Sequence, residues 1–166
     1  MPLEPSDQKH WEAASGYVQL GMYFEADAEL DEIDPFCRAA PEVLAVRLEI
    51  YAGLKKWELM QTVAKKLAEH DPQNVQWAIS WAYATRRAES IEAAKEILMQ
   101  TLQHHPNEAM VHFNLGCYAA QLGDLTLAKA HLKRAFVIEP KCRLTALHDP
   151  DLKPIWAEIG NLGTEG

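Results

Sequence analysis

The sequence lacks the cysteine pairs that would indicate a disulfide framework or a zinc site. Its three cysteines, Cys37, Cys117 and Cys142, are an odd number at wide spacing and form no CxxC motif. Basic residues are also scarce, because 16 Lys and Arg stand against 24 Asp and Glu and give a net charge of −8. Such a surface repels the phosphates of nucleic acids. We therefore expect a reducing compartment and no nucleic-acid partner.

Long hydrophobic runs are missing as well. No stretch approaches the roughly 18 apolar residues of a membrane-spanning helix, and residues 1–10 lack the features of a secretory signal. With 48% hydrophobic and 24% charged residues, the composition is that of a folded protein. We expect a cytoplasmic protein without a membrane partner, built as one domain or one short repeat array.

Motifs of catalysis and cofactor binding are not found. The sequence has no GxSxG, P-loop or Rossmann glycine pattern and no HExxH motif. His104 and His105 would point about 100° apart on a helix, so they are poorly placed to bind one ion. His112 and His131 fall on different predicted helices without an acidic partner, so we expect surface or capping roles for the histidines. We predict no enzyme activity, no catalytic residue, no cofactor and no metal site.

Acidic residues are concentrated near the beginning of the chain. Residues 25–34 contain six carboxylates, which we interpret as the solvated outer face of a helix. Calcium binding is the alternative, but the run lacks the glycine turn of a calcium loop. Basic residues are in excess over residues 109–142. An elongated ligand would therefore be expected to direct its basic end toward the acidic region.

A period of 34 residues runs through most of the chain. Frames at residues 7–40, 41–74, 75–108 and 109–142 align without insertion, and such a period is typical of stacked helix pairs. The columns include Tyr17, Tyr51, Thr85, Ala119; Gly21, Lys55, Glu89, Gly123; Tyr23, Trp57, Ile91, Leu125; and Ala26, Met60, Ala94, Ala128. The second of these columns marks a turn, and the last begins an apolar stripe at i, i+4, i+7.

Helix boundaries follow from this period. We expect helices near residues 7–20, 23–34, 41–53, 57–70, 74–87, 90–104, 107–121 and 125–138. Ser6, Ser90 and Asp124 are expected to cap helices, and Pro41 suits a first helical turn.

The frames resemble tetratricopeptide repeats. The fourth frame matches best, with Asn114-Leu115-Gly116, Leu122-Gly123-Asp124, Ala128, Ala135 and Pro140. The first two frames diverge, since Met60 stands at a small-residue position and Arg38 replaces the closing proline. The resemblance implies an all-α fold, a right-handed α-solenoid of stacked antiparallel helix pairs.

The expected organisation has four parts. These are an N-terminal extension (1–6), the repeat array (7–142), C-terminal capping helices (143–160) and a disordered tail (161–166). A repeat stack ends in an apolar face that needs a cover, here on the second helix of the fourth frame. The apolar residues available for it are Leu144, Leu147, Leu152, Ile155, Trp156 and Ile159.

In the tetratricopeptide family, the first helices of successive repeats line a concave groove that binds ligands. The matching positions include Trp11, Ser15, Glu42, Ala45, Val46, Glu49, Ile79, Tyr83, Arg86, Arg87, Met110, Phe113 and Asn114. Aromatic and Met side chains on such a strip favour an interaction site, with Arg86 and Arg87 as its cationic element. Alternatively, the C-terminal segment fills the groove and these residues are core.

Three functions are compatible with the sequence. The first is a scaffold or adaptor that binds a peptide or helix of a partner protein in the groove. The second is a small chaperone similar to those of type III secretion, by analogy of repeat and size. The third is a structural unit that associates with itself. The carboxylate clamp of chaperone-binding repeats is absent, because only Asn114 among the corresponding positions has a clamp-like side chain.

Overall fold

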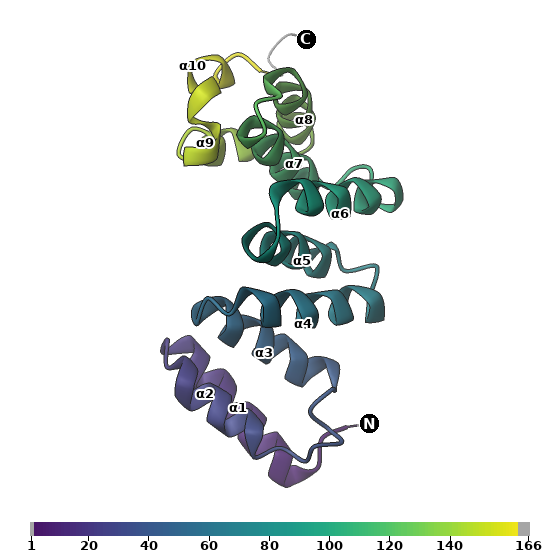
Figure 1. The fold of residues 1–166 in the computed structure, drawn as a ribbon, viewed down its shortest axis with the longest axis vertical. Coiled ribbons are helices and arrows are strands. Elements are labelled where there is room, and N and C mark those ends of the chain that lie inside the picture. The colour runs from purple at the N-terminus through teal and green to yellow at the C-terminus, as the bar shows by residue number, and fades with distance from the viewer. Residues whose placement is uncertain (1, 163–166) are drawn as a thin grey trace. The chain divides into compact units, whose positions relative to one another are not determined.

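The computed structural model describes residues 2–162, and all regular secondary structure in this range is helical. The long helices are α1 (Pro5–Gln19), α2 (Tyr23–Asp31), α3 (Pro41–Gly53), α4 (Trp57–His70), α5 (Val75–Ala88), α6 (Ile91–His104), α7 (Ala109–Gln121) and α8 (Leu125–Ile138). The short elements are α9 (Cys142–Ala146), the 3-10 helix η1 (Pro150–Ile155) and α10 (Trp156–Ile159). Short turns connect most of the long helices, and a longer segment, residues 32–40, joins α2 to α3 (Figure 1). The predicted all-α solenoid of helix pairs is confirmed.

The chain divides into two compact units, Met1–Ala88 and Glu89–Gly166. We call them unit 1 (α1–α5) and unit 2 (α6–α10). The division falls inside the third predicted frame, so the count of four repeats stays a prediction. Most of the predicted tail at 161–166 lies outside the described residues.

Helix ends follow local sequence signals. Ser90 Oγ accepts a 3.1 Å hydrogen bond from Ala93 N, and Asp124 Oδ1 accepts a 3.0 Å bond from Leu127 N, so both predicted caps are confirmed. The Ser6 prediction is wrong, because α1 begins at Pro5 and its N-cap position is Glu4. Proline fits the first helical turn because it has no N–H to leave unpaired.

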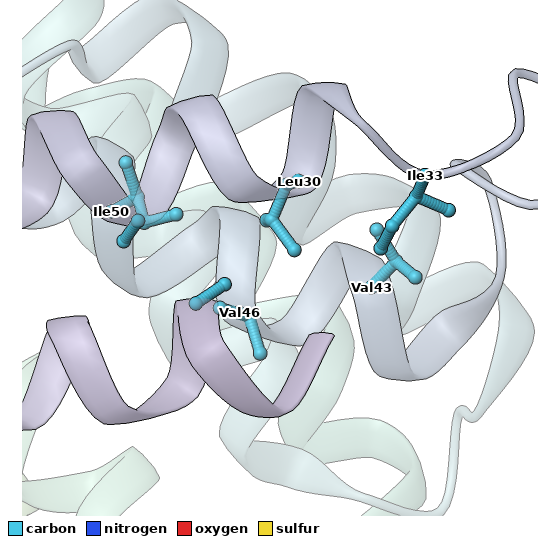
Figure 2. Close-up of a cluster of buried hydrophobic side chains, with 7 residues drawn as sticks. Leu30, Ile33, Val43, Val46 and Ile50 are labelled. Atoms are coloured by element: carbon cyan, nitrogen blue, oxygen red, sulfur yellow. The ribbon is translucent and has the colours of Figure 1, made fainter. Parts of the chain in front are cut away.

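The core of unit 1 forms where α1, α2 and α3 meet. Its buried residues are Ala14, Ala26, Leu30, Ile33, Val43, Val46 and Ile50. Figure 2 shows Leu30 and Ile33 facing Val43, Val46 and Ile50. The stripe from Ala26 is thus buried as its spacing predicts. A second cluster joins α3, α4 and α5 through Leu48, Met60, Val63, Ala64, Leu67 and Ala84.

The acidic run at residues 25–34, most of which lies on α2, is only partly a solvated face. Arg47 of α3 is paired with Asp27 at 2.6 Å and with Asp31 at 2.9 Å. His10 Nδ1 of α1 lies 2.7 Å from Glu29 Oε2. Three of the six carboxylates therefore help to hold α2 against its neighbours in unit 1.

Unit 2 is centred on α7, which packs against α6, α8 and η1. A Cβ on Gly116 would lie 2.8 Å from Leu132 Cγ, so only glycine allows α7 and α8 to approach this closely. Leu152 and Ile155 of η1 are buried. Cys117 Sγ of α7 donates a 3.7 Å hydrogen bond to Asp149 Oδ2.

The C-terminal segment therefore covers mainly α7, the first helix of the predicted fourth repeat. The cover expected from the sequence, on the second helix of that repeat, is wrong. Of the residues expected to form the cover, Leu152, Ile155 and Ile159 are buried, but Leu144 is 66% exposed. Arg143 joins the segment to its own end, since Nη1 donates a 2.8 Å hydrogen bond to Ile159 O. The break at Asp149-Pro150 is where this chain crosses from α9 to η1.

Candidate functional site

The beginning of α4 and the end of α5 border an open pocket of about 420 Å³ within unit 1. Its lining residues are Lys55, Lys56, Trp57, Glu58, Leu59, Arg87 and Ala88. We call it the basic pocket because three cations line it against one carboxylate. The pocket exists because α4 and α5 pack as consecutive antiparallel helices, which brings the start of one beside the finish of the other.

Two aromatic rings and a guanidinium pack together at the basic pocket. The rings of Trp57 and Tyr83 meet edge to face, with centroids 5.7 Å apart and planes at 83°. The Arg87 Cζ atom lies 5.5 Å from the centroid of each ring, and Nη2 donates a 3.4 Å hydrogen bond to Tyr83 Oη. These cation–π contacts orient the guanidinium. Tyr83 is nevertheless 39% exposed, so the cluster forms part of the surface of unit 1.

The turn before α4 has an unusual backbone. Lys55 has a φ of 56°, whereas two of the three matching positions in other turns are glycines, Gly21 at 71° and Gly123 at 83°; the third is Glu89. A side chain in this left-handed region costs about 1 kcal/mol, which glycine does not incur. The next residue, Lys56, lies 5.9 Å from the Tyr51 ring centroid. Its Nζ is also 4.0 Å from Asp27 Oδ2.

A second pocket of about 440 Å³ lies at the other end of the α4–α5 pair. Its lining residues are Pro41, Glu42, Ala45, Leu67, His70, Asp71, Asn74 and Trp77. We call it the acidic pocket after Glu42 and Asp71. Because α5 has 14 residues and a helix rises 1.5 Å per residue, the two pockets are roughly 20 Å apart along the helices.

The predicted groove residues of α1 and α3 are mostly packed within unit 1. Trp11 is half-buried, and its Nε1 donates a 3.0 Å hydrogen bond to Glu42 O, which ties α1 to α3. Ser15 Oγ bonds at 2.9 Å to Trp11 O in its own helix. Val46 is 8% exposed and belongs to the core, so its expected place on an open surface is wrong. Glu49 is exposed.

The predicted residues of α5 are the most accessible group in unit 1. Tyr83 and Arg87 are exposed, whereas Ile79 and Arg86 are half-buried. Arg86 also interacts with another group of the protein. The structure thus places Tyr83 and Arg87 at one site and adds Trp57 from α4.

In unit 2 the predicted groove residues lie on α7. Met110 is 42% exposed and Asn114 is half-buried, but Phe113 is only 3% exposed. Since η1 packs against α7, the C-terminal segment occupies part of this helix face, as the alternative interpretation expected. Phe113 is therefore core and does not line an open groove.

Two histidines form an unexpected contact in unit 2. His112 Nε2 lies 2.9 Å from Pro106 O; a carbonyl only accepts, so this nitrogen is the donor. His112 Nδ1 then accepts from His131 Nδ1 at 3.3 Å. Within residues 2–162, the buried Nε2 of His131 has no hydrogen-bond partner. Burial lowers the pKa of His131, and His112 and Lys95 add to the effect. The expected surface role is wrong for His112, which is buried.

The thiols of Cys37 and Cys142 do not have an activating environment. Burial raises the pKa of Cys37, and the carboxylates of Asp7 and Asp34 raise it further. Burial also raises the pKa of Cys142, with a contribution from Glu139. A raised pKa disfavours the thiolate that nucleophilic catalysis requires.

Residues 2–162 contain neither a metal-binding cluster nor a membrane-spanning helix. These residues contain no group of three or more His, Cys, Asp or Glu side chains placed to hold a metal ion. None of their helices combines the length and apolar character needed to cross a bilayer.

Six of the seven residues that line the basic pocket, all except Arg87, lie outside the predicted groove. In the predicted repeats, Trp57 opens a second helix, and Lys55 and Lys56 belong to the turn before it. One signal was visible in the sequence: Lys55 stands in a column that contains Gly21 and Gly123. A lysine at a glycine position of a turn is a reason to examine that turn for a function.

The fold of this chain is similar to that of proteins of known structure. No family model matches the sequence, and neither does any curated protein. Solved structures of MamA, an all-helical TPR-like solenoid, are similar. MamA RS-1 ArsTM double mutant has a TM-score of 0.72 at 16% identity, covering 84% of this chain and 79% of that one. MamA MSR-1 C2 has 0.66 at 22%, covering 78% and 74%, and MamA AMB-1 C2221 has 0.65 at 15%, covering 95% and 91%. At these identities the likeness establishes the fold alone.

Proposed function

We propose that this protein is a non-enzymatic cytoplasmic scaffold or adaptor that binds a peptide or helix of a partner protein, with its principal contacts on α5 of unit 1. The proposal rests on one observation, the exposed cluster of Tyr83 and Arg87 with Trp57 at the mouth of the basic pocket. Tyrosine, tryptophan and arginine are the residues most enriched at the energetic centres of protein interfaces. The TPR-like fold supports the proposal because it presents helix faces in series.

The cluster is suited to binding because its members are held in place before a partner arrives. The edge-to-face contact of Trp57 and Tyr83 and the position of Arg87 limit side-chain motion. Less conformational entropy is then lost on association. In contrast, Val46 and Phe113 are buried, so we leave them out of the proposed contact surface.

Charge would orient a bound segment. The acidic pocket and the basic pocket lie at opposite ends of the α4–α5 pair. We propose that a segment lying along these helices directs a basic residue toward Glu42 and Asp71 and an acidic residue toward Arg87. Complementary charges of this kind favour one orientation and speed association more than they add affinity.

Two other functions use the same surface. A small chaperone would bind an unfolded client there, and a self-associating unit would bind a second copy of the chain. Size-exclusion chromatography over a range of concentrations separates self-association from the proposed adaptor, because only self-association depends on the concentration of the chain itself.

The test uses the full chain as bait in a native lysate, followed by affinity measurement with the captured protein. Arg86→Glu with Arg87→Glu should weaken binding more than tenfold at low salt, and less at high salt as screening increases. Because Arg86 is half-buried, Arg87→Glu alone is tested beside it. Lys65→Glu with Lys66→Glu, an exposed pair on α4, controls for net charge. Unchanged affinity of both arginine variants at low salt would contradict the proposed site.

A further inference from the structure

The turn before α4 contains a residue with a strained backbone, Lys55. Among residues 2–162, Lys55 is the one non-glycine residue with a positive φ. Glycine occupies the equivalent turns at Gly21 and Gly123, and it would remove the steric cost here too. A side chain held in such a conformation is a reason to look for a role of that side chain.

Lys55 lines the basic pocket with Lys56 and Arg87. Of these cations, Lys56 is partly neutralised by Asp27 at 4.0 Å. The contacts of Arg87 are with the rings of Trp57 and Tyr83, and rings leave its positive charge uncompensated. The pocket therefore has more positive than negative charge, on a chain whose net charge is −8. A local site of this kind attracts a carboxylate while the rest of the surface repels extended polyanions.

Apolar side chains of the pocket narrow the ligand class. Leu59 is 47% exposed, and Trp57 and Ala88 border the same space. A free inorganic anion would make no use of these groups, whereas a peptide with an apolar residue beside its acidic ones would contact both kinds of lining. The volume of about 420 Å³ is enough for more than one side chain.

We propose that the basic pocket binds acidic side chains of a peptide segment, with an apolar residue of that segment on Trp57 and Leu59, and that Lys55 keeps its left-handed backbone because its ammonium group contacts those carboxylates. This inference rests on the proposed function, since it names the chemistry of the partner at that site.

The probe is a synthetic nonapeptide of alternating Glu and Leu with both ends blocked, and its reference is the same peptide with Gln in place of Glu. Binding to the full chain is followed by the indole N–H signal of Trp57, assigned with Trp57→Phe. We expect a saturable shift of that signal with the Glu peptide and at least tenfold weaker binding of the Gln peptide. Equal binding of the two peptides, or an equal shift with inorganic phosphate alone, would overturn the proposal.

Lys55 variants separate charge from folding. Lys55→Gly should raise the unfolding midpoint, because the strain is relieved, and still weaken the Glu peptide about two- to fivefold, the range of one exposed ion pair. Lys55→Gln should weaken it equally without the gain in stability. Lys66→Gln on α4, outside the pocket, is the matched control. The proposal fails if Lys55→Gly binds as tightly as the parent, or if Lys66→Gln is as harmful.

The captured partner distinguishes this inference from the proposed function. A partner whose affinity falls with Tyr83→Ala and Arg87→Ala but not with Lys55→Gln would leave the proposed function standing and overturn the acidic-segment inference. A partner insensitive to Tyr83→Ala and Arg87→Ala would contradict the proposed site, while the Glu and Gln peptides still decide what the basic pocket binds.

Discussion

Leu152 provides a direct test of whether the C-terminal segment belongs to the core of unit 2. It is fully buried in η1, which packs against α7. Replacing a buried leucine by alanine removes apolar contacts and leaves a cavity, at a cost of about 3 kcal/mol. Leu144 in the same segment is 66% exposed, so Leu144→Ala should cost less than about 0.5 kcal/mol. The two variants make the same chemical change and differ in burial.

For a unit of this size, 1 kcal/mol corresponds to about 4–8 °C in the unfolding midpoint. Leu152→Ala should therefore lower the midpoint of unit 2 by roughly 12–24 °C, measured by circular dichroism on the full chain. Hydrogen exchange should locate the loss, with α7 amides exchanging about 100-fold faster and α1–α3 unchanged. The reasoning is refuted if Leu152→Ala melts within about 2 °C of the parent, or if Leu144→Ala is equally damaging.

Two further predictions concern unit 2. Gly116→Ala should destabilise it by about 1–3 kcal/mol in urea denaturation, because the new Cβ would lie 2.8 Å from Leu132 Cγ. Gly16→Ala in α1, where nothing lies within 4 Å, should be neutral or stabilising, and equal effects of the two would contradict the close approach of α7 and α8. The stability of unit 2 should fall as the pH drops below about 6.5, because the pKa of His131 is lowered in the folded state and the unfolded chain then binds more protons. His131→Gln should flatten this dependence, whereas the exposed His104→Gln should keep it; a flat profile in the parent would show that the histidine contact does not contribute.

Local sequence was enough to predict the helices. Their observed bounds follow the 34-residue frames closely, and Ser90, Asp124 and Pro41 stand where the sequence indicated. These features depend on contacts within a few residues, such as a cap or the periodicity of one helix face. The acidic run illustrates the limit, because three of its carboxylates pair with Arg47 or His10 on other helices.

The sequence by itself therefore determined the all-helical fold and the turns. Only the tertiary structure decided how deeply each side chain lies and which distant residues meet. The resemblance to tetratricopeptide repeats placed Val46 and Phe113 in the same expected groove as Tyr83, yet the first two are buried and Tyr83 is exposed. Burial depends on what packs over a helix, and the meeting of Trp57 with Arg87 depends on how α4 lies against α5. Neither property is encoded in the spacing of residues along one helix.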